Sequence, residues 1–244
     1  MGALYVAYSG TRLLADDNRN AAFHRAARLL SIERWMHVDF EHSLNQFFVH
    51  HGTIALLGCY YYSTAHYLVT LAAMVWLYWQ GRAAYVPARR VLVVATLLAL
   101  GLYLLMPTAP PRFMPGFTDV LALHAHQGWW GQDASAPRGM GNLTNQLAAF
   151  PSLHAGWSLW VAIMVHKVSR HRWLRALGWA NAVATVLVIL GTANHWVLDV
   201  AVGWSVVIVG YAAVAAFMPR SILNGVPLHQ LDEQDVAVGS SSPR

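Results

Sequence analysis

One hydrophobic run of this chain opens with the stretch Phe150-Pro151-Ser152-Leu153-His154-Ala155-Gly156. A second histidine follows 41 residues later, in Asn194-His195-Trp196-Val197-Leu198-Asp199, again at a junction between two apolar runs. Positions i and i+4 share a face of a helix, so we expect the carboxylate of Asp199 to reach the ring of His195. The sequence therefore predicts one imidazole that a carboxylate orients and a second, separate imidazole on His154.

The composition is that of a membrane protein. The 244 residues are 57% hydrophobic and only 11% charged, against roughly 25% charged residues in a typical soluble domain. The net charge of +5 comes from 15 arginines and one lysine. They flank apolar runs without forming a basic stripe, so we expect no nucleic-acid partner. The single cysteine, Cys59, excludes an intramolecular disulfide and is interpreted as core packing.

Five apolar stretches are long enough to cross a bilayer, which takes about 20 residues in a helix. The expected spans are 52–79, 88–106, 151–168, 173–194 and 196–218. They predict an all-α fold, a polytopic transmembrane helical bundle. The apolar residues 1–10 are too short to cross, and we interpret them as the end of a possible sixth span truncated at the N-terminus.

The chain divides into three parts. Residues 1–51 form an N-terminal segment, in which 19–51 mixes charged and apolar residues as an amphipathic helix in the membrane interface does. Residues 52–218 form the transmembrane core, and residues 219–244 are predicted to be a disordered cytoplasmic tail. The charges of the interfacial helix are expected to face solvent, although Glu33 or Glu41 can instead turn toward the site.

The junctions between spans fall on one face of the predicted bundle, together with a loop of about 44 residues, a length typical of lids and binding loops. Trp129, Trp130 and Met140 of this loop are expected to cover the junctions. Basic residues gather at the opposite face, which the positive-inside rule places in the cytoplasm. We therefore expect a multi-pass protein of the cell membrane whose site, with His154 and His195, is extracytoplasmic.

These parts suit chemistry at phosphorus. With Asp199 holding one ring nitrogen protonated, the other nitrogen of His195 can attack a phosphorus atom and form a phosphohistidine. His154 can protonate the departing oxygen and later deprotonate the incoming alcohol or water. We expect Ser152 and the first turn after Pro151 to bind the substrate phosphate.

Other polar residues complete the predicted site. Arg112, placed by neighbouring prolines, is expected to bind the phosphate through its guanidinium. The alternative is that Arg112 anchors the loop to lipid headgroups. Further possible substrate contacts are Tyr61, Tyr62, His66 and Asn194. The first three share one span at helical spacing, which slightly favours packing over substrate contact.

Two other functions use the same residues. Zinc accepts ligands such as His154, His195 and Asp199, but no HExxH helix is present, so we expect neither a metal nor another cofactor. A non-catalytic lipid transporter or scramblase would carry ionisable residues through the middle of its spans. Here those residues stand at span ends, which favours an enzyme.

The quoted motifs resemble the second and third signature motifs of the type 2 phosphatidic acid phosphatase superfamily, and Pro-Thr-Ala-Pro-Pro-Arg-Phe at 107–113 resembles its inositol phosphorylceramide synthase-like branch. The similarity runs from about residue 33 to residue 204. It implies that His195 is the nucleophile, that Asp199 orients it, that His154 is the acid, and that no metal is required.

Two cations of the superfamily pattern are missing. The first motif, a lysine several residues ahead of Arg-Pro, is absent, and Ile189 replaces the arginine usually found six residues before the third-motif histidine. The synthase-like branch also lacks them and moves a phospho-headgroup from one lipid to another alcohol, so the resemblance favours transfer.

The resulting prediction is an integral membrane lipid phosphotransferase that is independent of metal. It moves a phosphoryl group or phospho-headgroup from a phospholipid or polyprenyl phosphate to an alcohol acceptor. Hydrolysis of a lipid phosphate or polyprenyl diphosphate is the main alternative.

Overall fold

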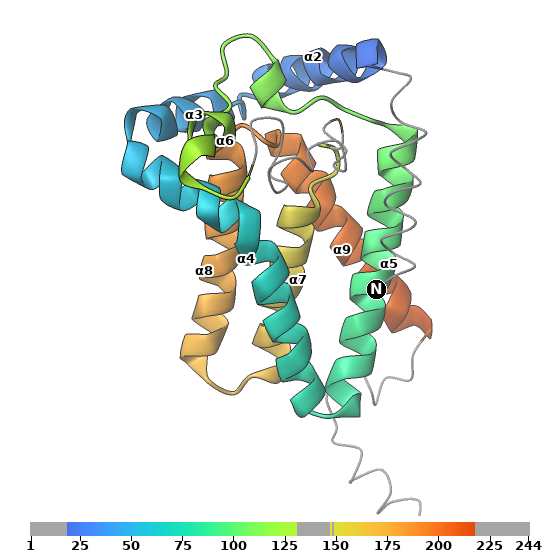
Figure 1. The fold of residues 1–244 in the computed structure, drawn as a ribbon. Coiled ribbons are helices and arrows are strands. Elements are labelled where there is room, and N and C mark those ends of the chain that lie inside the picture. Colours follow the sequence, from blue (N-terminus) through green and yellow to red (C-terminus); the bar gives the residue numbers. More distant parts are fainter. Residues whose placement is uncertain (1–18, 131–146, 148, 218–244) are drawn as a thin grey trace, which may run out of the picture.

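The computed structural model describes residues 19–130, 147 and 149–217, and over these residues all of its regular structure is helical (Figure 1). The predictions for the truncated span, for Met140 and for the tail after residue 218 lie outside the described residues.

Five long helices form the bundle and follow the expected stretches closely. They are α4 (Gly52–Trp79), α5 (Arg82–Leu105), α7 (Leu153–Val168), α8 (Arg172–Gly191) and α9 (Val197–Phe217). The start of α5 lies six residues earlier than expected, directly after Gly81, whose φ of +100° favours glycine. The end of α8 lies three residues earlier than expected, because the chain turns there toward α9.

Three of these helices, α5, α8 and α9, are long and apolar enough to cross a membrane. At 1.5 Å per residue the 16 residues of α7 reach only about 24 Å, short of a hydrocarbon core of about 30 Å. The 28 residues of α4 are long enough but include a run of tyrosine, serine, threonine and histidine near the middle. The structure thus supports three of the five expected spans by length and composition.

The outward faces of the bundle are apolar. Exposed side chains include Leu57, Leu68, Leu71, Leu97, Leu105, Leu177 and Ile208. These side chains are distributed over α4, α5, α8 and α9, whereas monomeric soluble proteins rarely expose large apolar patches. This surface is the one that a helical bundle presents to lipid.

The short helix α7 is the centre of the bundle and contacts α4, α5, α8 and α9. Half of its 16 residues are buried, among them Trp160 at 0% exposure. Its first turn lies against α9, where a Cβ on Gly203 would approach the Ser152 carbonyl oxygen to 2.3 Å. Glycine therefore permits the close crossing that brings the start of α7 to the start of α9.

Helices α2 (Arg19–Trp35), α3 (Glu41–His50) and α6 (Val120–Leu123) lie over one end of the bundle (Figure 1). The prediction of one continuous helix over 19–51 is therefore wrong, because the segment forms two helices. The chain breaks after Trp35, where His37 adopts φ +57° and the N–H of Val38 donates to the carbonyl oxygen of Glu33. These contacts form a Schellman-type end, with histidine in the place that glycine usually takes.

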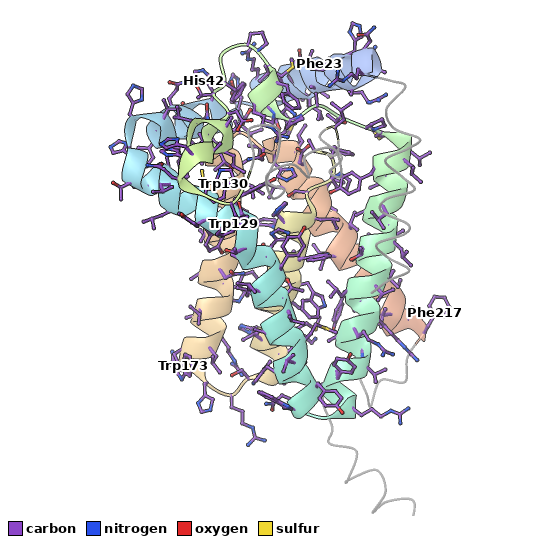
Figure 2. The ribbon with its side chains drawn as sticks, viewed as in Figure 1. Phe23, His42, Trp129, Trp130, Trp173 and Phe217 are labelled. Carbon is purple, nitrogen blue, oxygen red and sulfur yellow. The ribbon has the colours of Figure 1, made fainter. Side chains whose placement is uncertain are left out.

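The loop after α5 packs along α4. Trp129 and Trp130 lie together beside α4 (Figure 2), and both rings contact the ring of Tyr60. Trp130 is fully buried, and its indole N–H donates to the Leu121 carbonyl oxygen at 3.0 Å. Trp129 and Trp130, which were expected to cover the junctions, therefore pack against α4, and Trp130 belongs to the hydrophobic core.

Candidate functional site

The backbone of His195 is held in a closed turn between α8 and α9. The N–H of Asn194 donates to the carbonyl oxygen of Ile189 at 3.0 Å, and that of Ala193 donates to Leu190 at 2.9 Å. These two bonds form a Schellman motif, in which Ala193 adopts the left-handed conformation with φ +57°. Such a residue costs about 1–3 kcal/mol and is found preferentially at functional sites.

The ring of His195 has a defined tautomer. Its Nδ1 lies 2.9 Å from the carbonyl oxygen of Ala149. Because a carbonyl oxygen only accepts, Nδ1 carries the proton and Nε2 keeps a free lone pair. Burial lowers the pKa of His195 to about 3, and the nearby positive charge of Arg112 acts in the same direction. The imidazole is therefore neutral at physiological pH and suited to nucleophilic attack.

Asp199 has two contacts at the start of α9. Its Oδ2 accepts the N–H of Trp196 at 2.8 Å and lies 3.4 Å from Nδ1 of His195. The first contact is half of a capping box, in which a carboxylate reaches back three residues to the helix start. The expected pairing of Asp199 with His195 is thus present, but the Ala149 carbonyl is the closer partner of the ring.

His154 lies in the first turn of α7, and its ring centroid is 5.4 Å from that of His195. Tyr62 of α4 stacks on the His154 ring at 4.6 Å with an interplanar angle of 18°, and the ring of His66 lies 3.9 Å away. A narrow cavity beside these rings is lined by Tyr61, Tyr62, His66, His154, Thr185 and Ile189. Two histidines predicted from separate motifs therefore meet in one site.

Arg112 is attached to the turn that carries His195. It lies in the short helix η2 (Pro111–Phe113), and its backbone N–H donates to the carbonyl oxygen of Ala193 at 2.8 Å. Its guanidinium donates to the side-chain oxygen of Asn194 and lies 3.4 Å from Oδ2 of Asp119. The guanidinium is thus fixed beside His195, and its remaining N–H groups can bind an anion.

Ser152 is the N-cap of α7 and is fully buried. Its Oγ accepts the N–H of Ala155 at 3.2 Å, and its own N–H donates to the carbonyl oxygen of Asp199 at 3.0 Å. The second bond ties the starts of α7 and α9 together. The helix begins at Leu153, one residue after Ser152, and its first N–H groups lie next to His154.

A family model described as PAP2 superfamily matches residues 27–213. The match covers most of the chain and includes both histidines, Asp199 and Arg112. This chain belongs to the PAP2 superfamily. Members of the superfamily are typically phosphatases or phosphotransferases. Neither a search of curated proteins nor a search of solved structures finds a match.

Position 189, where the resemblance predicts an arginine, holds an apolar residue. Ile189, six residues before His195, is 1% exposed and lines the cavity that His154 also lines. Arg112 therefore supplies a positive charge near His195, whereas position 189 supplies none.

The other predicted contacts differ in how they are held in this PAP2 protein. The hydroxyl group of Tyr61 donates to Oδ1 of Asn181 at 2.8 Å, which links α4 to α8. Asn194 accepts from Arg112 and donates to Oγ1 of Thr192 at 2.9 Å. Both side chains thus have structural partners, whereas the rings of Tyr62 and His66 contact His154. Their contact with substrate stays a prediction.

The structure decides between the two interpretations of the acids in the N-terminal segment. The charges were expected to face solvent, with the alternative that Glu33 or Glu41 turns inward, and both side chains are 0% exposed. The signal that could have found Glu33 is helical spacing, because Glu33 follows Ala22 and Ala26, which α2 also buries, by eleven and seven residues. Glu41 begins α3 and has no comparable signal. The Ala149 carbonyl was also missed, because a backbone partner far away in sequence leaves no motif.

The zinc alternative finds no support in the geometry. The parts of the chain that the structure describes hold no group of three or more His, Cys, Asp or Glu side chains arranged to hold a metal ion. The roles expected for His154, His195 and Asp199 stay predictions.

Proposed function

We propose that this PAP2 protein is an integral membrane lipid phosphotransferase that works through a phosphohistidine on His195. The observation that carries the proposal is the fixed ring of His195, with Nδ1 bonded to Ala149 and Nε2 free, 5.4 Å from the ring of His154. A neutral nucleophile with a second imidazole nearby suits two successive displacements at phosphorus.

In the first step, Nε2 of His195 attacks the phosphorus atom of the donor lipid. A P–N bond forms, the P–O bond to the leaving group breaks, and protonated His154 gives its proton to the departing oxygen. In the second step, the oxygen of an acceptor alcohol attacks the same phosphorus atom. The P–N bond breaks, His154 takes the proton of the alcohol, and His195 is restored.

We propose that three groups bind the phosphate. The guanidinium of Arg112 is fixed by Asn194 and Asp119, the hydroxyl of Ser152 retains its own proton as a donor, and the first turn of α7 contributes backbone N–H groups. Charge stabilisation of this kind is usually the largest contribution to acyl and phosphoryl transfer. In this proposal, the phosphate group of the substrate binds between these groups and His195.

Transfer is favoured over hydrolysis by the surroundings of the two histidines. His195 is buried, and the apolar Ile189 stands where the resemblance predicts a cation. The indole rings of Trp129 and Trp130 pack beside α4. Exclusion of water leaves the phosphohistidine to an oriented alcohol. The inositol phosphorylceramide synthase-like branch shares the missing cations. We therefore propose a phospholipid or polyprenyl phosphate donor and an alcohol acceptor, with simple hydrolysis as the alternative.

An extracytoplasmic site is part of the proposal. The turns between α4 and α5 and between α7 and α8 lie at the end of the bundle opposite α2 and α3 (Figure 1). They carry or adjoin Arg82, Lys167, Arg170, Arg172 and Arg175, and Arg89 and Arg90 follow within α5. The positive-inside rule assigns such an end to the cytoplasm of the cell.

The experiment supplies purified protein in nanodiscs with a labelled phospholipid donor, with and without inositol, glycerol or a lipid alcohol. We expect a labelled lipid or alcohol product whose rate depends on the acceptor, and no product from the His195→Ala variant. Release of phosphate or phospho-headgroup at one rate whatever the acceptor, with no transfer product, would leave a phosphatase.

A further inference from the structure

Two buried carboxyl groups join the N-terminal helices to the start of α9. Glu33 of α2 and Glu41 of α3 are both 0% exposed, and their carboxyl groups are neighbours that influence each other electrostatically. Oε1 of Glu33 accepts the backbone N–H of Leu198 at 2.7 Å. Leu198 directly precedes Asp199, so a side chain of α2 contacts the turn that orients His195.

The start of α9 is therefore capped by carboxyl groups from two different helices. The N–H of Trp196 donates to Asp199, and the N–H of Leu198 donates to Glu33. The first N–H groups of a helix have no partner within the helix, and their bonding partners fix the direction of the first turn. Asp199 belongs to this turn, and its Oδ2 is the atom that faces Nδ1 of His195.

Helices α2 and α3 are themselves fixed over the site. The buried Asn45 of α3 donates to the carbonyl oxygen of Gly191 at the end of α8, at 2.9 Å. The carbonyl oxygen of Ala22 in α2 accepts the N–H of Ala109, and the carbonyl oxygen of Ala109 accepts the indole N–H of Trp196. These hydrogen bonds fix α2 and α3 over the end of the bundle, and they thereby fix the position of Glu33 relative to α9.

We propose that Glu33 is a positioning residue, which caps the first turn of α9 and so holds Asp199 and His195 in the geometry of phosphoryl transfer. On this account α2 is part of the catalytic assembly, in addition to any contact with the membrane surface. The inference rests on the proposed function, because it assigns Glu33 a role in the reactivity of His195.

Burying two neighbouring carboxyl groups is unfavourable, because a charge on either group would lose its hydration. The groups that face Glu33 are Glu41 from α3 and Asp199 from α9, and those near Glu41 are Asp39 and His42. Burial raises the pKa of Glu33 to about 9 and raises the pKa of Glu41 as well. Neutral pH thus leaves Glu33 protonated beside Asp199, with its carbonyl oxygen still available to Leu198.

The sign of the pH effect follows from this shift. The folded pKa of Glu33 lies above its ordinary value of 4.5, so its contribution to stability is complete below that value and is lost as the pH rises through about 9. Ionisation places a negative charge on the buried Glu33 beside Asp199 and disturbs the capped turn. We expect activity to fall over the same alkaline range.

The test compares Glu33→Ala, Glu33→Gln and Asp39→Asn in nanodiscs, with kcat and KM measured from pH 6 to about 10. Asp39→Asn is the matched control, because it removes a partly exposed carboxylate from the same segment. Glu33→Gln keeps an oxygen acceptor for Leu198 and cannot ionise.

We expect Glu33→Ala to lower kcat on the order of 10- to 10²-fold with KM nearly unchanged. Glu33→Gln should keep most of kcat at neutral pH and lose the alkaline fall. Normal kcat in Glu33→Ala, or equal damage from Glu33→Gln, would overturn the proposal. If Glu33→Ala does not fold, the Glu33→Gln profile decides, and an unchanged alkaline fall overturns it.

The His195→Ala variant separates this inference from the proposed function. An active His195→Ala protein would refute the phosphohistidine mechanism, whatever the Glu33 variants do. An inactive His195→Ala protein together with a fully active Glu33→Ala protein would refute only the positioning role.

Discussion

The two histidines of the site are held in opposite ways. His195 is 4% exposed, and its ring and backbone are fixed by Ala149, Asp199 and the turn after α8. The ring of His154 lies between aromatic faces from α4, and among the described residues none forms a hydrogen bond with it. One imidazole has a fixed tautomer, whereas no hydrogen bond from a described residue fixes the tautomer of the other.

This difference matches what two displacements at phosphorus require. A nucleophile needs one defined lone pair and a fixed direction of attack, which a bonded Nδ1 provides. A group that first gives and then takes a proton needs one ring nitrogen that can change its protonation state. Hydrogen bonds hold the first histidine and ring contacts hold the second, so the two should respond differently to substitution.

The largest expected effect separates the two histidines directly. His195→Ala should abolish turnover, a loss on the order of 10⁴- to 10⁶-fold as for other catalytic nucleophiles. His154→Ala should be equally inactive on the lipid donor. On an activated aryl phosphate, whose leaving group needs no proton, His154→Ala should recover part of the phosphorylation step.

The measurement is the release of the aryl alcohol by each variant in one detergent, with the fold checked by thermal unfolding. Equal inactivity of both variants on the aryl phosphate would remove the distinction between nucleophile and acid.

The second effect concerns the carboxylate beside His195. Asp199→Asn keeps an oxygen for the N–H of Trp196, so the cap of α9 and the fold should persist. The charge that faces the His195 ring is lost, which costs on the order of 10²- to 10⁴-fold in other histidine–aspartate pairs. Because Ala149 is the closer partner of Nδ1, we expect kcat to fall toward the lower end of that range. A nearly normal kcat would show that Asp199 serves only as a cap of α9.

The third effect tests the anion site attached to the His195 turn. Arg112→Lys keeps the charge but loses the planar fork that contacts Asn194 and Asp119, so we expect kcat/KM to fall about 10- to 10²-fold. A lysine protein with nearly full activity would favour the alternative, in which Arg112 only anchors the loop to lipid headgroups.

The smallest effect sharpens the description of His154. Tyr62→Leu removes the aromatic face that stacks on the His154 ring, and such a contact contributes about 0.5–1.5 kcal/mol. We expect kcat to fall about 2- to 10-fold on the lipid donor and much less on the aryl phosphate, where the acid is not needed. An equal loss on both substrates would mean that Tyr62 supports the fold or the His195 side instead.

The arrangement of the bundle was largely predictable, because apolar length and helix ends are local properties of the sequence. The bounds of α4 were predicted without error, and the junctions that carry His154 and His195 do gather at one end. The end of the interfacial helix after Trp35 was not predictable. It depends on the left-handed conformation of His37, and a histidine, unlike a glycine, does not indicate such a conformation in the sequence.

The candidate site was predictable where its partners are close in sequence. His195 and Asp199 are four residues apart and meet as expected. The Ala149 carbonyl and the Glu33 carboxyl reach the same turn from 46 and 165 residues away. Such contacts depend on how α2 and the segment before α7 pack on α9, which no local pattern specifies.

The central claim is that His195 carries the phosphoryl group, and one labelling measurement tests it most directly. Purified protein is mixed with a labelled aryl phosphate that it accepts, stopped within one turnover, and digested under alkaline conditions that preserve phosphohistidine. We predict acid-labile label on the peptide that contains His195, more of it in His154→Ala, and none in His195→Ala. Label on His154, or turnover without any labelled protein, would contradict the account.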